Sequence, residues 1–130
     1  MYKRQNEGDR AALLAHPEAL TYSDVLLAEG RCRVATAASG IVVGFAATSS
    51  GGDHFELEDL FVDPDWMRRG VGKALVADLV QQAHSADISR IEVNGNPHAR
   101  LFYEDAGFVI DRVVQTEFGA GFRMHLEVPR

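Results

Sequence analysis

Three basic residues and two glycines gather in one short segment, Arg68-Arg69-Gly70-Val71-Gly72-Lys73, which we call the phosphate loop. It follows an apolar stretch typical of a strand and opens a stretch with helical periodicity. The first amides of a helix have no partners within the helix, and the helix dipole adds partial positive charge there. Glycines let a ligand approach the backbone, and the basic side chains add full charges. The segment therefore predicts an anion site suited to a pyrophosphate.

Two common nucleotide-binding patterns do not fit this segment. A Walker loop requires a glycine five positions before Gly72, where Met67 stands, and a hydroxyl residue where Ala74 stands. A dinucleotide fingerprint that begins at Gly70 would need a third glycine at the position of Leu75. A nucleotide-binding α/β domain stays as an alternative, which stronger thermal stabilisation by ATP than by coenzyme A would support.

Two segments resemble the GNAT acetyltransferases. Residues 67–72, Met-Arg-Arg-Gly-Val-Gly, resemble motif A of that family, Gln/Arg-x-x-Gly-x-Gly/Ala, with Met67 in place of Gln or Arg. The preceding Leu60-x-Val62-x-Pro64 is typical of the family's fourth strand and its exit. Residues 96–108 resemble motif B, Asn-x-x-Ala-x-x-Phe/Leu-Tyr-x-x-x-Gly-Phe. The two motifs stand in the family's order and separation, and the resemblance covers about residues 31–128.

The resemblance implies acetyl-CoA as cosubstrate and an α/β (α+β) GNAT fold. In that fold the parallel fourth and fifth strands of a mixed central sheet splay apart around the pantetheine arm, and helices flank the sheet. Backbone groups of Leu60 and Val62 would pair with pantetheine, and amides of the phosphate loop would bind the pyrophosphate. The cofactor-binding residues implied in this way are Leu60, Phe61, Val62, Arg68, Arg69, Gly70, Val71, Gly72, Lys73, Asn96 and Tyr103. Because most of this grip is main-chain, we expect Met67 to weaken or rearrange cofactor binding without abolishing it.

Direct attack of an amine on a thioester needs a proton removed from the amine and another supplied to the leaving thiolate. Tyr103 is the predicted acid, because a phenol with a pKa of about 10 can protonate a thiolate whose thiol has a pKa of about 8.5. The family places a tyrosine at this position for that purpose. Glu58 is the predicted base. Glu56, Asp59 and Glu92 stay open as alternatives, since strand alternation places Glu56 and Glu58 on one face and Asp59 on the other.

The periodicity of the chain predicts the elements that must position these residues. Helices are expected at 7–16 and from Gly70 onward, and a second helix or turn-helix at 18–29. Asn96 caps a further helix, with Pro97 at its first position and Gly107 at its end. Strands are expected at 31–38, 41–47, 54–62, 88–93, 108–116 and 121–128, with loops at 49–53 and 119–121. This order indicates a single α/β domain over residues 1–130.

The start of the chain departs from the family pattern. The family usually begins with a strand carrying an Ile-Arg-x-Ala type segment, and residues 1–5 lead almost directly into helix-like sequence. We expect that first strand to be missing, as in a truncated or misassembled reading frame. The open sheet edge left behind could pair with another subunit and form a homodimer.

Composition narrows the classes of partner. A net charge of −6 argues against a nucleic-acid binder and fits a cationic substrate, such as a small-molecule amine or a peptide amine. No apolar run approaches the roughly 18 residues of a membrane span. The polar N-terminus and the single Cys32 favour the cytoplasm. The five histidines show no metal-ligand spacing, so we predict no metal.

Two functions are consistent with the GNAT resemblance. The first is an enzyme that acetylates a small-molecule amine, a peptide N-terminus or a lysine. The second is a GNAT-type module that binds coenzyme A without turnover, as a sensor or partner domain. Met67 favours the second function, whereas Tyr103 and the acidic fourth strand favour the first.

Overall fold

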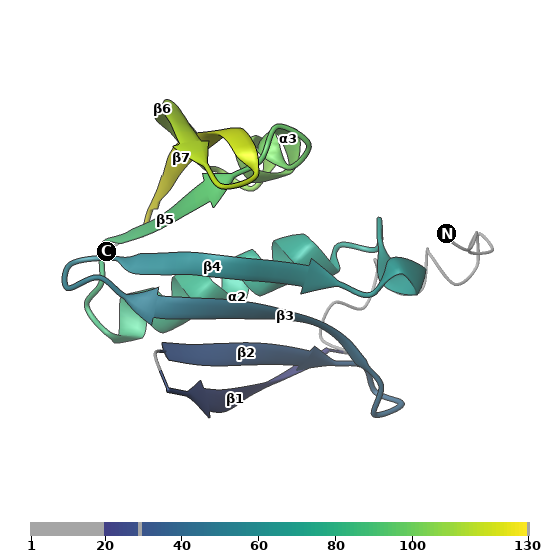
Figure 1. Ribbon diagram of the computed structural model, residues 1–130. Coiled ribbons are helices and arrows are strands. Elements are labelled where there is room, and N and C mark those ends of the chain that lie inside the picture. The colour runs from purple at the N-terminus through teal and green to yellow at the C-terminus, as the bar shows by residue number, and fades with distance from the viewer. Residues whose placement is uncertain (1–19, 29, 130) are drawn as a thin grey trace. The chain divides into compact units, whose positions relative to one another are not determined.

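The computed structural model describes residues 20–28 and 30–129. Its strands and helices follow the chain in the order β1 (Thr21–Leu27), β2 (Gly30–Thr36), β3 (Val42–Ser50), β4 (Phe55–Val62), α2 (Val71–Ser85), β5 (Arg90–Gly95), α3 (Arg100–Asp105), β6 (Val109–Thr116) and β7 (Gly119–Glu127) (Figure 1). The strands form one sheet in the order β1-β2-β3-β4-β5-β7-β6. None of the helices in the described part is long and apolar enough to cross a membrane.

The fourth and fifth strands form the parallel pair that the GNAT resemblance predicts. Their register runs from Phe55↔Ile91 to Leu57↔Val93, and β4 then continues to Val62. The neighbouring pairs β1–β2, β5–β7 and β6–β7 are antiparallel. The mixed sheet with a parallel fourth and fifth strand is therefore confirmed.

The chain divides into two compact units, which are described separately. The first comprises Met1–Ala47 and Asp59–Asp78. Within it, β3 approaches β4 closely at Gly44, where an added Cβ would lie 2.6 Å from the Phe61 carbonyl oxygen. Val71 and Leu75 of α2 pack against the same glycine, at 3.3 and 3.2 Å from that Cβ position. Glycine is thus required where the sheet and the start of α2 meet.

A charged pair joins β2 to α2 within this first unit. Arg33 donates two hydrogen bonds of 2.7 Å to the Asp78 carboxylate, and a third of 3.3 Å to Asp24 on β1. The Arg33 and Asp78 side chains keep only 13% and 9% of their surface exposed. A planar guanidinium matches a carboxylate in this two-bond geometry, which fixes orientation as well as distance.

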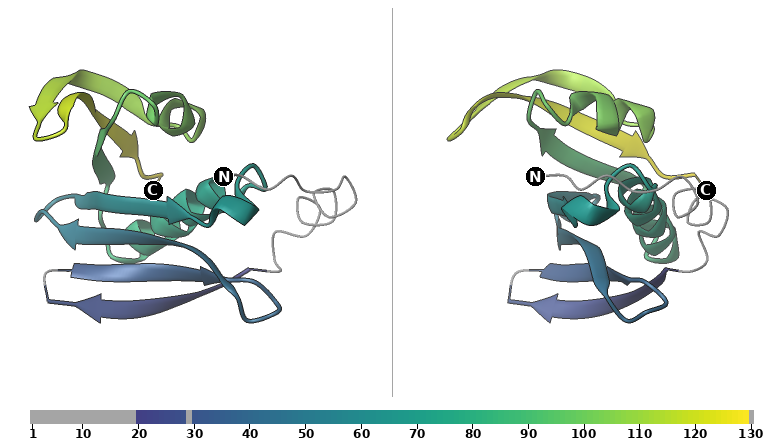
Figure 2. Two further views of the ribbon diagram at one scale, coloured as in Figure 1. Left: turned by 45° about the vertical axis from the view of Figure 1, so that its right-hand side comes forward. Right: turned by 90° about the vertical axis from the view of Figure 1, so that its right-hand side faces the viewer.

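The second unit comprises Thr48–Glu58 and Leu79–Arg130. Its core is built on one face of β4, β5 and β7, with Leu57, Ile91, Val93 and Met124 at most 3% exposed. Helix α3 contacts β6, and both views of Figure 2 show it beside the β6–β7 hairpin. A bulge interrupts the β6–β7 register at Asp111, between Ile110 and Arg112.

The helix predicted at 18–29 is wrong where the structure describes it. Thr21–Leu27 is a strand that pairs antiparallel with β2 along its whole length. Its apolar residues do not form a buried helical stripe, because Val25, Leu26 and Leu27 are all exposed. Thr21, Tyr22 and Val25 are residue types that favour strands.

The expectation that the family's first strand is missing rests on residues 1–5, which lie outside the described residues. The predicted helix at 7–16 lies there too. In the described part, the edge position before β2 belongs to β1.

Two loop boundaries also need correction. Ser49 and Ser50 extend β3 instead of forming a loop, since the Ser49 hydroxyl donates to Glu58 on β4 at 2.6 Å. The last hairpin turns at residues 117–118, where Thr116 Oγ1 accepts from the Phe118 amide and donates to the Gly119 carbonyl. The expected loop at 119–121 is therefore part of β7.

The helix expected from Pro97 begins later, at Arg100. Residues 97–99 form a turn, because the Asn96 side chain and carbonyl both accept from the Ala99 amide, at 2.8 and 3.0 Å. Gly107 ends the helical segment with a φ of 111°, as predicted.

Candidate active site

The phosphate loop begins after β4 has ended and a 3₁₀ turn, Pro64–Trp66, has redirected the chain. Asp63 starts this turn by accepting a hydrogen bond from the Asp65 amide at 2.8 Å. Arg68 and Gly70 then adopt positive φ angles of 65° and 83°. Such angles are uncommon for a residue other than glycine and cost about 1 kcal/mol or more. Left-handed residues of this kind let backbone amides converge on an anion.

Helix α2 leaves this loop with its first amides available to a ligand. The bond from Ala74 N to Gly70 O, 2.9 Å long, closes the first turn, so the three preceding amides have no acceptor within the helix. No acidic residue lies in that turn. Because the positive end of the helix dipole adds to the loop's basic side chains, this end of α2 attracts phosphate groups.

Arg69 gives the most specific indication that the loop binds an anion. Its guanidinium stacks on the Trp66 ring, with Cζ 4.8 Å from the ring centroid. Its Nε is buried and has no hydrogen-bond partner among the described residues. A buried donor without an acceptor costs about 1–3 kcal/mol, and an anion bound at the loop could supply one. The residues present therefore fit a cofactor that bears a pyrophosphate.

The end of β4 presents backbone groups in alternating directions. The Phe61 carbonyl lies against Gly44 of β3, and the Asp63 amide donates to Val43 O at 2.8 Å. Successive residues of a strand direct their backbone groups to opposite edges, so those of Leu60 and Val62 are directed away from β3. This arrangement supports the predicted role of Leu60 and Val62. Any cofactor contact of Phe61 would come instead from its ring, which is 47% exposed and stacks on Phe45.

Tyr103, the predicted acid, lies in the second unit and is 7% exposed. Its ring meets Phe102 and Phe108 edge-on, each with a centroid distance of 5.2 Å. The Phe108 amide donates to the Tyr103 carbonyl at 2.9 Å. Tyr103 therefore belongs to the helical apolar stripe and is also held in one orientation, so the structural and catalytic roles are compatible. Asn96, from the same motif, closes the turn that precedes α3.

The acidic candidates for the base differ in what they contact. Glu58 accepts one hydrogen bond, from Ser49 Oγ, and is exposed. Glu56 and Glu92 instead bind the Arg123 guanidinium, at 2.6–2.7 Å. Asp59 is exposed and belongs to the first unit. Within the second unit, Glu58 is the acid of β4 and β5 that is not held by a guanidinium.

The neighbours of Glu92 shift its titration. Burial opposes ionisation of Glu92, but the hydrogen bond from Arg123 and the charges of His54, Arg123 and Arg90 outweigh it and lower its pKa. The same contacts raise the pKa of Arg123, chiefly through its hydrogen bond with Glu56. Glu92 is therefore a weaker proton acceptor than an ordinary glutamate, which argues against it as the base.

His54, Glu56 and Glu92 also have the composition of a metal site, with ligand atoms within 4.8 Å of one another. However, Arg123 already bonds both carboxylates, and the two ring nitrogens of His54 face different acids. A metal ion would have to displace the arginine. We therefore interpret the cluster as an ion-pair network, and the absence of a metal stays a prediction.

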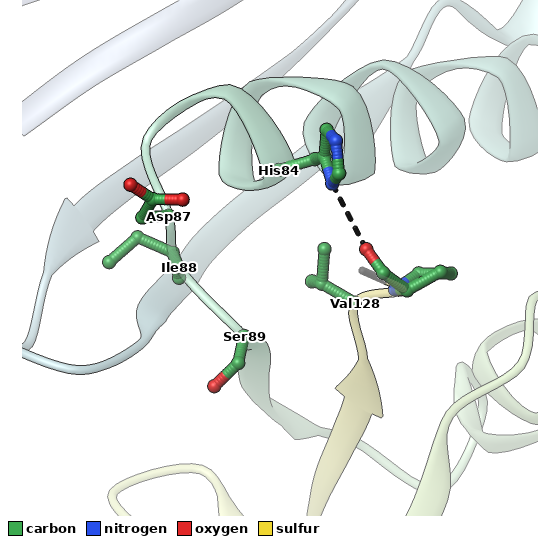
Figure 3. Close-up of a pocket in the computed structure, with 6 residues that line it drawn as sticks. His84, Asp87, Ile88, Ser89 and Val128 are labelled. Carbon is green, nitrogen blue, oxygen red and sulfur yellow. Dashed lines mark hydrogen bonds between the residues drawn. The ribbon is translucent and has the colours of Figure 1, made fainter.

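A pocket of about 300 Å³ lies in the second unit, at the C-terminal end of α2. It is lined by His84, Asp87, Ile88, Ser89, Val128 and Pro129. Figure 3 shows the His84 ring bonded to the Pro129 carbonyl, with Nδ1 and O 3.0 Å apart. None of the residues predicted to bind the cofactor lines this pocket.

The structure thus assigns the predicted residues to two groups. The phosphate loop and Leu60–Val62 lie together in the first unit, and Glu58, Asn96 and Tyr103 lie in the second. Sequence reasoning missed Ser49 and Arg123, which contact the acids of β4 and β5. Arg123 gave a signal, since it is a charged residue between the apolar Phe122 and Met124.

Comparison with known families identifies the family of this chain. The family model described as "Acetyltransferase (GNAT) domain" matches residues 14–127. The chain belongs to the GNAT acetyltransferase family. The resemblance read from motifs A and B is therefore confirmed, and the nucleotide-binding alternative is not.

Two curated GNAT relatives illustrate the range of similarity. The uncharacterized N-acetyltransferase ycf52 of Pyropia yezoensis is 37% identical over 75 residues, which cover 57% of this chain and 43% of the relative. The glucosamine 6-phosphate N-acetyltransferase of Trypanosoma brucei brucei is 31% identical over 77 residues, covering 54% of this chain and 52% of the relative. The chain spans less than half the length of the ycf52 proteins of Pyropia yezoensis and Porphyra purpurea.

Solved GNAT structures share the fold at low sequence identity. A GNAT family acetyltransferase from Elizabethkingia anophelis, with acetyl-CoA bound, has a TM-score of 0.76 and 12% identity, over 85% of this chain and 99% of that protein. The PaiA N-acetyltransferase of Thermoplasma acidophilum, in complex with coenzyme A, has a TM-score of 0.64 and 19% identity, over 74% of this chain and 59% of that protein. Both likenesses show the GNAT fold.

Proposed function

We propose that this GNAT chain transfers an acetyl group from acetyl-CoA to a primary amine of a small molecule or peptide, as a single GNAT domain. The single observation that carries the proposal is the phosphate loop. It combines two left-handed residues, a helix start and the buried Nε of Arg69, which has no hydrogen-bond partner in the described part of the chain. The family model spans residues of both units, which supports a single domain.

The residues of the first unit would bind the cofactor. The amides at the start of α2 and the Arg69 guanidinium would hold the pyrophosphate, while Leu60 and Val62 would offer backbone groups to pantetheine. The cosubstrate supplies the acetyl thioester. The Asp63 cap and the stacking of Arg69 on Trp66 preorganise the loop. Cofactor binding therefore loses little conformational entropy in the loop.

Glu58 would accept the proton of the amine. An alkylamine with a pKa of about 10.4 is almost fully protonated at neutral pH, which costs about 4.6 kcal/mol to reverse. An exposed carboxylate that accepts from a serine hydroxyl is available to a cationic amine, directly or through a water. The hydroxyl of Ser49 restricts the orientation of that carboxylate.

Tyr103 would supply a proton to the leaving thiolate. Its ring is fixed by two edge-on aromatic contacts and by the backbone at Phe108. A fixed donor needs no reorganisation at the moment of transfer, which is the condition for efficient general acid catalysis.

A second candidate function is a module that binds coenzyme A without turnover. One observation favours it, because Met67 replaces the polar residue that opens motif A and leaves 44% of its surface exposed. Weak cofactor binding would then suffice for sensing, and the acids of β4 would serve only the fold.

Thiol release from acetyl-CoA tests both candidates. Purified protein is incubated with acetyl-CoA and a panel of polyamines, aminoglycosides, amino acids and peptides, and the acetylated product is identified by mass. We expect thiol release that depends on one class of amine. Binding of coenzyme A with no turnover for any amine would support the module instead, and no binding at all would exclude both functions.

A further inference from the structure

Arg123 of β7 forms the most highly bonded side-chain cluster in the second unit. Its Nη1 lies 2.6 Å from Glu56 Oε2 and 3.0 Å from Asn94 Oδ1. Its Nη2 lies 2.7 Å from Glu56 Oε1 and 2.7 Å from Glu92 Oε1. The three charged side chains are only 15%, 21% and 19% exposed, in the order Arg123, Glu56 and Glu92. One guanidinium therefore ties β4, β5 and β7 together on the face opposite the core.

The cluster holds β4 just before the residue proposed as the base. Glu56 and Glu58 lie on the same face of the strand, since they are two residues apart. Between them, Leu57 is 2% exposed on the opposite face and pairs with Val93 in the last parallel rung. Glu58 is thus the first residue of β4 beyond the parallel pairs. The two residues before it are held on opposite faces of the sheet, Glu56 by Arg123 and Leu57 by burial in the core.

The hydrogen bonds of Arg123 also determine which carboxylates are available to the amine. Glu56 uses both carboxylate oxygens on Arg123, and Glu92 uses one on Arg123 and the other on Arg90, at 3.2 Å. Two carboxylates facing each other in register would repel without this guanidinium. Their hydrogen bonds to Arg123 occupy both carboxylates, so an incoming cationic amine meets Glu58 as the available acid on this face of β4.

We propose that Arg123 is a positioning residue for acetyl transfer: by clamping Glu56 to Glu92, it fixes the segment of β4 from which Glu58 receives the proton of the amine. The inference rests on the proposed function and adds to it a residue that touches neither substrate nor cofactor. Arg123 acts through Glu58, and its own hydrogen bonds leave it little capacity to bind an anionic acceptor.

Three single variants of the full chain test the clamp. R123Q removes the charge, and R123K keeps the charge but loses the two-bond geometry. R90Q is the matched control, because Arg90 also contacts Glu92 and lies on the same sheet, but is 35% exposed and does not touch Glu56. We expect R123Q to lower kcat for the amine about ten- to hundredfold, since a displacement of about 1 Å at a catalytic group costs up to about 100-fold. R123K should fall between R123Q and the native protein, and R90Q should stay within about twofold of it.

A double-variant cycle separates positioning from loss of structure. In the E58Q background the base is already absent, so R123Q should lower kcat by less than about twofold further. The KM for acetyl-CoA should stay within about twofold in every variant. A variant that merely loosened the fold would lower activity by the same factor with and without Glu58, and would raise that KM as well.

Each outcome decides for or against the clamp. Full kcat in R123K and R123Q, or equal losses from R123Q in the native and E58Q backgrounds, would overturn it. If R123Q does not fold, as judged by circular dichroism, R123K alone decides, since it retains the cation between the two glutamates. A normal rate in E58Q would show that Glu58 is not the base and would contradict the role of Arg123, but acetyl transfer itself would remain supported. A native protein that acetylates no amine would contradict the proposed function.

Discussion

The ring of Tyr103 lies directly against Gly95, where a Cβ would come within 3.2 Å of Cδ2 and 3.4 Å of Cε2. We expect Gly95→Ala to push the ring by a few tenths of an ångström and to destabilise the protein by about 1 kcal/mol. Because the displaced ring carries the proposed acid, kcat should fall about tenfold. Urea unfolding and thiol-release kinetics measure the two effects.

The cause of the Gly95→Ala effect can be isolated with Tyr103→Phe. In that background the ring is still pushed, but there is no hydroxyl to misplace. Gly95→Ala should then lower the free energy of unfolding as before and leave the remaining kcat unchanged. A further tenfold loss of kcat would show that Gly95 acts through something other than the Tyr103 hydroxyl.

Tyr103→Phe alone should lower kcat about 10- to 100-fold, because the thiolate would leave without a positioned proton donor. The ring contacts with Phe102 and Phe108 are preserved in this variant, so coenzyme A should still bind with a Kd within about twofold. Isothermal titration and thiol release provide the two measurements. An unchanged rate would remove Tyr103 from the mechanism.

Local patterns predicted the phosphate loop and motif B, since their determinants are contiguous: a strand end, two glycines, basic residues and a helix start. The clamp around Arg123 could not be predicted in this way, because Arg123 lies 67 residues from Glu56 and 31 from Glu92 along the chain. Only the pairing of β4, β5 and β7 brings them together. The prediction of a helix for β1 was wrong because its apolar residues are adjacent and exposed. Neither the two-residue period of a strand nor the 3.6-residue period of a helix therefore identifies a buried face.

Met67→Gln restores the polar residue that opens motif A. Met67 is extended, with φ −66° and ψ 151°, and half-exposed, so glutamine fits without repacking a core. We expect coenzyme A to bind about two- to tenfold more tightly, through one added hydrogen bond of about 0.5–1.5 kcal/mol. Titration calorimetry of both proteins tests this, with Met67→Leu as the apolar control. Equal affinity of all three proteins would show that position 67 does not touch the cofactor.

Arg69→Met separates cofactor binding from folding. The variant removes the buried Nε that lacks a partner, so the ligand-free protein should be no less stable in urea than the native one. Binding of coenzyme A should weaken about tenfold, and the rise in melting temperature on adding coenzyme A should shrink accordingly. Arg112→Gln, an exposed arginine on β6, is the control and should change neither quantity. A native-like shift in Arg69→Met would exclude Arg69 from the phosphate site.

His54 should make the stability of the protein depend on pH. Its pKa is raised, first by the hydrogen bond to Asp53 and then by Glu56 and Glu92, against a smaller opposing effect of burial. A folded pKa above the unfolded value of about 6.5 means that the protonated ring stabilises the fold. This contribution is fully present below about pH 6.5 and is lost as the pH rises through the folded pKa. His54→Gln should therefore cost more stability at pH 5.5 than at pH 8.5, as measured by urea unfolding, whereas the exposed His98→Gln should show no such difference. A cost for His54→Gln that is the same at both pH values would mean that the ring is held by packing over Gly51 and not by its charge.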